Sequence, residues 1–124
     1  MNTNKKVLII EDETPLLNIL SDKLSSAGYA VVKAQDGKSG LASAISEKPN
    51  LILLDITMPI MDGLTMLKYL RQEETIKDTE VVLLTNSSSS NLLVEALTLG
   101  AHDYLVKSDW SLDDVVKLVD GKLK

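Results

Sequence analysis

Short apolar runs that end in polar residues recur along this chain. Four of them occupy residues 7–10, 51–54, 81–84 and 104–106. A short apolar run bounded by polar residues is typical of a β-strand that is buried on both faces of a sheet. Stretches with helical spacing of leucine, valine and alanine separate the runs. The pattern predicts an α/β fold in which helices cover both sides of a parallel sheet.

The same pattern predicts five strand–helix units. The strands are expected at residues 6–11, 29–34, 51–55, 81–85 and 102–106. The helices are expected from about residues 14, 37 and 111, and around the leucine patterns of residues 64–70 and 92–99. Pro15 suits the first turn of a helix, whereas Gly28 and Gly100 suit positions just past a helix end.

Length and composition narrow the class of protein. The chain has 124 residues, which suits one domain spanning residues 1–124 with no linker or second domain. It has no cysteine, which excludes disulfides and thiolate chemistry, and its net charge of −5 argues against nonspecific nucleic-acid binding. No apolar stretch approaches the roughly 20 residues of a membrane helix, and none resembles an export signal. We therefore expect a cytoplasmic protein.

Polar side chains that can carry chemistry follow the apolar runs directly. Carboxylates come first, at Glu11, Asp12 and Asp55, and a hydroxyl and an ammonium follow later runs at Thr85 and Lys107. Ligands of open parallel sheets bind beyond the carboxyl ends of the strands, where these side chains are expected to gather. Several carboxylates at one place repel one another unless a cation joins them. Oxygen ligands without histidine or cysteine favour Mg²⁺.

Phosphoryl transfer fits this set of groups. A carboxylate can act as the nucleophile and form an aspartyl-phosphate, and Asp55 is the best candidate because it ends the predicted central strand. Glu11 and Asp12 would hold the metal. Lys107 is a flexible point charge suited to a phosphate oxygen, and Thr85 supplies a hydroxyl donor.

These motifs resemble the receiver domain of two-component response regulators over essentially the whole chain. Any one of the motifs is weak, but their order and spacing together are specific. The matching features are Glu11-Asp12, Asp55 in Leu-Leu-Asp-Ile-Thr-Met-Pro, Met61-Asp62-Gly63, Thr85, and Gly100-Ala101-His102-Asp103-Tyr104 before Lys107.

The resemblance implies a flavodoxin-like (βα)5 fold, a doubly wound parallel sheet with strand order 2-1-3-4-5. It also implies that a histidine kinase or histidine phosphotransfer protein phosphorylates Asp55, and that the backbone carbonyl of Thr57 completes the Mg²⁺ shell. In the family's switch, the Thr85 hydroxyl moves toward the phosphoryl group while Tyr104 turns inward. The message then passes by protein contact to a downstream target or output domain, without direct contact to nucleic acid or membrane. Such a domain catalyses only its own phosphorylation and dephosphorylation.

Three positions depart from the family pattern or flank the site. Ser108 stands where the family usually has a proline after the lysine. Asn86 is larger than the residue often found after the threonine, and we expect it to slow hydrolysis of the phosphoryl group. Thr57 also flanks the acceptor and is expected to tune the lifetime of the phosphorylated state.

Three other functions remain as alternatives. A haloacid-dehalogenase-like phosphatase also forms an aspartyl-phosphate, but it needs a second aspartate where this chain has Thr57. A flavodoxin-like electron carrier shares the fold, but the acidic loop after residue 10 would repel a flavin phosphate. A pseudo-receiver would act as a docking module without phosphoryl chemistry, although all the expected site residues are present.

Overall fold

A five-stranded parallel sheet forms the centre of the protein, with strand order β2-β1-β3-β4-β5. The computed structural model describes residues 5–56, 61–85, 91–101, 103–107 and 109–123. The strands are β1 (Lys6–Ile10), β2 (Ala30–Ala34), β3 (Leu51–Asp55), β4 (Glu80–Thr85) and β5 (Asp103–Val106). Both the doubly wound fold and the strand order predicted from the sequence are confirmed. The order places β1 beside β3, at the point where the chain reverses its direction across the sheet.

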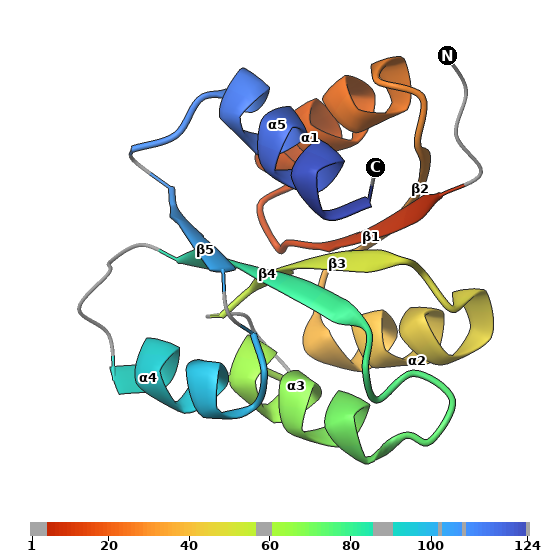
Figure 1. Ribbon diagram of the computed structural model, residues 1–124, viewed down its shortest axis with the longest axis vertical. Helices are drawn as coiled ribbons and strands as arrows, with labels where there is room; N and C mark the ends of the chain where they lie inside the picture. The colour runs from red at the N-terminus through yellow and green to blue at the C-terminus, as the bar shows by residue number, and fades with distance from the viewer. Residues whose placement is uncertain (1–4, 57–60, 86–90, 102, 108, 124) are drawn as a thin grey trace.

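Helices cover both faces of the sheet (Figure 1). They are α1 (Thr14–Ser26), α2 (Gly37–Glu47), α3 (Gly63–Gln72), α4 (Asn91–Thr98) and α5 (Leu112–Leu123). In Figure 1, α1 and α5 lie above the sheet, and α2, α3 and α4 lie below it. Among the described helices, none combines the length and the apolar composition that a membrane crossing needs.

Side-chain alternation divides the core into two layers. Odd-numbered residues of the central strands β1 and β3 pack with α1 and α5, and even-numbered residues pack with α2, α3 and α4, as expected for a period of two. The first layer includes Val7, Ile9, Leu51 and Leu53. The second layer includes Leu8, Ile10, Ile52 and Leu54. All eight side chains are 0% exposed, so the sheet's centre is rigid and its strand ends are fixed in place.

The edges of the sheet differ from the prediction. The apolar run at residues 104–106 was expected to be buried on both faces, but β5 is an edge strand and is only partly buried.

Tyr29 was expected inside the second strand but lies before it. Its N–H donates to Leu24 O, and the N–H of Gly28 donates to Ser25 O, so both residues cap the C-terminal end of α1. The expected role of Gly28 as the residue past the helix end is confirmed by its φ of 102°.

Candidate functional site

The carboxyl edge of the sheet gathers the charged groups that the sequence singled out. Glu11 follows β1, Asp55 ends β3, Thr85 ends β4 and Lys107 follows β5. Backbone hydrogen bonds continue the strand pairing beyond the strand ends: Glu11 N–H donates to Ala34 O at 3.0 Å, and Lys107 N–H donates to Thr85 O at 2.7 Å. Backbone hydrogen bonds therefore fix the positions of these residues independently of their side-chain contacts.

Three carboxylates form a cluster at this edge. One oxygen from each of Glu11, Asp12 and Asp55 lies within 4.8 Å of the others. Glu11 is completely buried and Asp55 is 3% exposed, whereas Asp12 faces solvent. The set offers only hard oxygen ligands and one exposed position for entry, which suits a hydrated divalent cation such as Mg²⁺. The sequence prediction that these three side chains meet is confirmed.

Lys107 lies against the same carboxylates. Its Nζ is 2.9 Å from Glu11 Oε1 and 3.1 Å from Asp55 Oδ2, and its side chain is 14% exposed. Alternation explains the meeting, because residues 11, 55 and 107 continue the odd-numbered positions that face α1 and α5. Although the ammonium is close, Glu11 Oε1 is buried and accepts no well-directed hydrogen bond from any residue that the structure describes. That oxygen keeps a lone pair available for a metal ion.

The cluster carries more negative charge than one lysine neutralises. Burial, and after it the neighbouring charge of Glu11, raise the pKa of Asp55 to about 7, although Lys107 acts in the opposite direction. Burial also raises the pKa of Glu11. Burial disfavours the charged form of Lys107, but its contacts with Glu11 and Asp55 outweigh this and raise its pKa. A divalent cation would relieve the repulsion between the carboxylates.

A third carboxylate contacts Lys107 and was not singled out from the sequence. Glu13 Oε1 lies 3.3 Å from Lys107 Nζ, and Glu13 N–H donates to Glu11 Oε2 at 2.9 Å. The side chain of Glu13 is 62% exposed, so it lies at the rim of the cluster. The run Glu11-Asp12-Glu13 was visible in the sequence, but its third member could equally have been a solvated residue before α1.

Comparison with known proteins identifies the family. Residues 7–120 match the family model described as the response regulator receiver domain. This chain is a response regulator receiver domain. Receiver domains are signalling switches of two-component systems, and they typically use Mg²⁺ in the acidic pocket.

Curated relatives of this receiver domain include longer regulatory proteins. The alkaline phosphatase synthesis transcriptional regulatory protein PhoP of Bacillus subtilis is 38% identical over 84% of this chain and 42% of its own length. The transcriptional regulatory protein HprR of Escherichia coli is 39% identical over 96% of this chain and 52% of its own length. The receiver domain thus spans about half or less of these relatives.

Solved structures agree on the fold. The chemotaxis response regulator CheY4 of Vibrio cholerae superposes with a TM-score of 0.89 at 31% identity, covering 98% of this chain and all of CheY4. A CheY-like receiver domain protein of Methanospirillum hungatei also gives a TM-score of 0.89, at 29% identity, with 98% of this chain and 94% of that chain covered.

The remaining predicted residues are placed only in part. Thr85 is 5% exposed, whereas Tyr104 in β5 is 40% exposed. Thr85 is paired with Val106, and Tyr104 is paired with Leu83, so alternation puts Thr85 and Tyr104 on the same face of the sheet as α4. Thr57, Asn86 and Ser108 lie outside the described residues of this receiver domain.

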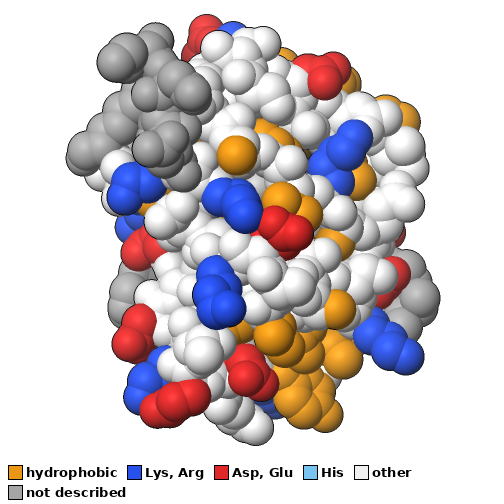
Figure 2. All heavy atoms as spheres, turned by 90° about the vertical axis from the view of Figure 1, so that its right-hand side faces the viewer, with side chains coloured by type: hydrophobic (Ala, Val, Ile, Leu, Met, Phe, Trp, Pro, Cys, Tyr) orange, Lys and Arg blue, Asp and Glu red, His pale blue; other side chains and the backbone are white. Residues whose placement is uncertain are grey.

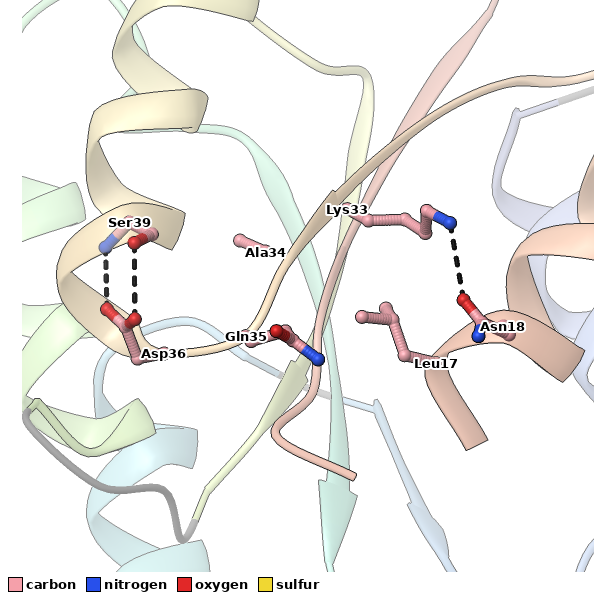
Figure 3. Close-up of a pocket in the computed structure, with 7 residues that line it drawn as sticks. All are labelled: Leu17, Asn18, Lys33, Ala34, Gln35, Asp36 and Ser39. Carbon is pink, nitrogen blue, oxygen red and sulfur yellow. Dashed lines mark hydrogen bonds between the residues drawn. The ribbon is translucent and has the colours of Figure 1, made fainter. Parts of the chain in front are cut away.

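A separate hollow of about 440 Å³ lies at the carboxyl end of β2, between α1 and α2 (Figure 3). Its polar lining is largely paired with itself: Lys33 Nζ donates to Asn18 Oδ1, and Asp36 accepts from Ser39. No carboxylate of the acidic cluster lines it. The acidic cluster, and not this hollow, is therefore the candidate functional site of this receiver domain.

Proposed function

We propose that this receiver domain accepts a phosphoryl group on Asp55 from a phosphohistidine of a sensor kinase or phosphotransfer protein. The observation that supports the proposal most directly is the contact of 3.1 Å between Lys107 Nζ and Asp55 Oδ2 inside a buried carboxylate cluster. A carboxylate nucleophile, a positive charge for the phosphoryl oxygens and a set of metal ligands are then in one place. Positioning and charge neutralisation are what phosphoryl transfer demands of a protein.

In the proposed reaction, an Asp55 carboxylate oxygen attacks the phosphorus. The new P–O bond forms as the P–N bond to the donor histidine breaks, and the electron pair stays on the imidazole nitrogen, which takes a proton from solvent. The ammonium of Lys107 stabilises charge on the phosphoryl oxygens, and the hydroxyl of Thr85 donates a hydrogen bond to one of them. Glu11, Asp12, Asp55 and, as the family resemblance implies, the carbonyl of Thr57 would hold Mg²⁺, which would supply the remaining charge neutralisation.

The signal then leaves the domain through a change of conformation. Phosphorylation adds acceptor oxygens that draw Thr85 toward Asp55, and Tyr104 follows inward from its exposed position on the same face. Coupling of this kind is typically worth about 1–3 kcal/mol, which biases an existing equilibrium without rebuilding the fold. Thr57 and Asn86 are proposed to tune the lifetime of the phosphoryl group, Asn86 by slowing its hydrolysis.

The output is proposed to be a protein contact. The curated relatives PhoP and HprR are named transcriptional regulators, and this chain matches only part of their length. The net charge of −5 does not favour direct contact between this domain and nucleic acid. The domain would therefore act on a downstream protein or on an output domain.

Intact-mass measurement tests the acceptor. Wild-type protein incubated with Mg²⁺ and acetyl phosphate should gain one phosphoryl group, Asp55→Asn should gain none, and Asp22→Asn, at an exposed position of α1, should label like wild type. Chelation of Mg²⁺ should stop the labelling. Equal labelling of wild type and Asp55→Asn would refute Asp55 as the acceptor. No labelling of any form would favour the docking module, and continuous release of phosphate at enzyme-like rates would favour the phosphatase.

A further inference from the structure

Two Asp-Gly pairs begin α2 and α3, which lie on the same side of the sheet (Figure 1). Asp36 caps α2, with Oδ1 accepting from Ser39 N–H at 2.8 Å, and Figure 3 shows this contact. Asp62 caps α3 in the same way, with Oδ1 accepting from Thr65 N–H at 2.8 Å. Such caps satisfy one of the backbone donors that the first turn of a helix leaves unpaired. The N–H of the glycine after each cap is another donor that has no partner within its own helix.

Both glycines donate that N–H to the segment between Asp55 and α3. Gly63 N–H donates to Ile56 O at 2.8 Å, directly after the proposed acceptor. Gly37 N–H donates to Met61 O at 3.0 Å, just before Asp62. The two helix starts therefore hold the connection between β3 and α3 at two points, and one of these points comes from α2. The described part of α2 contributes no side chain to the acidic cluster.

Neither glycine has room for a side chain. A Cβ on Gly37 would lie 2.1 Å from Met61 O, and a Cβ on Gly63 would lie 2.2 Å from Asp55 O. In both cases the obstacle is backbone, which cannot turn aside as a side chain can. The carbonyl of Met61 would have to move by close to 1 Å before the contact with Gly37 reached 3.0 Å.

We propose that Gly37 is a positioning residue for the phosphoacceptor, acting through Met61 and Gly63 on the backbone of Asp55. This inference rests on the proposed function. A shift of Met61 passes through Asp62 to Gly63, which packs on the carbonyl of Asp55. Misplacement of a reacting group by about 1 Å can cost about 100-fold in rate. Absence of a side chain at residue 37 thus keeps the acceptor aligned with Lys107 and the metal ligands.

The chain offers a matched control in the same helix. Gly40 is also buried in α2, and a Cβ there would lie 2.5 Å from Cδ1 of Ile10, which is a side-chain atom and not backbone. Its N–H donates within the cap to Asp36 O and not to the acceptor segment. Gly37→Ala and Gly40→Ala should both lower stability, but only Gly37→Ala should disturb the segment after Asp55.

Phosphorylation rates and Mg²⁺ affinity distinguish the two variants. Circular dichroism first establishes that both variants are folded. Gly37→Ala should then be phosphorylated by acetyl phosphate at least about 10-fold more slowly than wild type. Its dissociation constant for Mg²⁺, measured by calorimetry, should rise by about 3-fold or more, whereas Gly40→Ala should stay within about 2-fold in both measurements. A Gly37→Ala variant that matches wild type, or a Gly40→Ala variant that loses as much, would overturn the inference.

A measurement on the wild-type protein covers the case in which Gly37→Ala does not fold. In a Mg²⁺ titration followed by amide NMR, the Gly37 resonance should shift with the same binding curve as Asp12, and the Gly40 resonance should shift much less. A silent Gly37 amide would overturn the inference. If wild type neither binds Mg²⁺ nor takes phosphate, the proposed function fails first. If wild type is labelled and the glycine variants behave alike, only the role of Gly37 fails.

Discussion

Two lysines each join neighbouring strands, one at the carboxyl edge of the sheet, where the strands end, and one at the amino edge, where they begin. Their surroundings differ. At the carboxyl edge, Lys107 contacts Glu11 and Asp55, which are almost completely buried. At the amino edge, Lys122 in α5 contacts Glu80 and Asp103, where β4 and β5 begin. The side chains of these two carboxylates are 39% and 37% exposed, so water shares in neutralising them. Both lysines join two strands, but only Lys107 does so through buried carboxylates. On the face where the strands begin, acidic and basic side chains are interspersed on the open surface (Figure 2).

The difference shows what makes a charged cluster reactive. Around Lys122, one ammonium meets two hydrated carboxylates, and ion pairs of this kind contribute little beyond holding α5 in place. Around Lys107, burial leaves Glu11 and Asp55 short of positive charge, and the pKa of Asp55 rises to about 7 mainly because of burial. The amino edge is satisfied without a ligand, whereas the carboxyl edge gains most from a cation and from a group that Lys107 can contact.

Replacing each lysine by methionine should give the largest difference in phosphorylation rate between the two edges. Lys107→Met removes the charge that we propose stabilises the phosphoryl oxygens, and we expect phosphorylation by acetyl phosphate to slow about 100-fold. Mg²⁺ should bind the variant at least as tightly as wild type, because the competing ammonium is gone. Lys122→Met should label at the wild-type rate and lose about 1 kcal/mol of stability or less. Equal labelling rates for the two variants, measured by intact mass, would remove the distinction between the edges.

Part of this comparison could be predicted from the sequence. The apolar runs located four strand ends, and the odd numbers of Glu11, Asp55 and Lys107 placed them on one face once the strand order was known. Tertiary context decided the rest. Among the described strands, β5 pairs with β4 alone, so it lies at an edge of the sheet and its apolar run is only partly buried.

Contacts made by loops were beyond any pattern in the sequence. The donation from Gly37 to Met61 depends on how the segment after β3 passes the start of α2. In α2, Ala44 is completely buried, whereas the adjacent Ile45 is 37% exposed. Periodicity gives the face of a helix to within about a residue, and neighbouring helices decide which residue on that face is covered.

The pH dependence of stability should also differ between the edges. In metal-free protein, Asp55 has a pKa of about 7 against 3.8 for the ordinary carboxyl group, so the folded state binds a proton that the unfolded chain has lost. Stability therefore falls as the pH rises from about 4 to about 7. Asp55→Asn removes this effect and should stabilise the metal-free protein by about 2 kcal/mol more at pH 8 than at pH 5, measured by urea unfolding.

Asp103→Asn is the control for that measurement, because it removes a partner of Lys122 at the exposed amino edge. It should lower stability slightly at both pH values. Saturating Mg²⁺ should reduce the advantage of Asp55→Asn at pH 8, since the metal neutralises the wild-type cluster. A stabilisation by Asp55→Asn that is equal at both pH values would show that repulsion within the cluster is not the cause.

The smallest expected effect concerns Glu13, the exposed carboxylate that contacts Lys107 at the rim. Glu13→Gln removes one negative charge at the entrance while keeping the size of the side chain. Because exposed ion pairs contribute about 0.2–1 kcal/mol, stability should change by less than 1 kcal/mol. Labelling by the anionic donor acetyl phosphate should become about 2-fold faster at low ionic strength, and the gain should disappear near 1 M salt, where charges are screened within about 3 Å.

Glu47→Gln is the matched control for Glu13→Gln, because Glu47 forms an ion pair of 2.8 Å with Lys6 at the amino edge. It changes the net charge by the same amount, so any general effect of charge on the approach of the donor appears in both variants. A faster rate in Glu13→Gln alone would show that the field at the rim, and not the charge of the whole protein, limits entry of an anion. Equal rates in both variants would mean that Glu13 has no more influence on the site than a carboxylate at the far edge of the sheet.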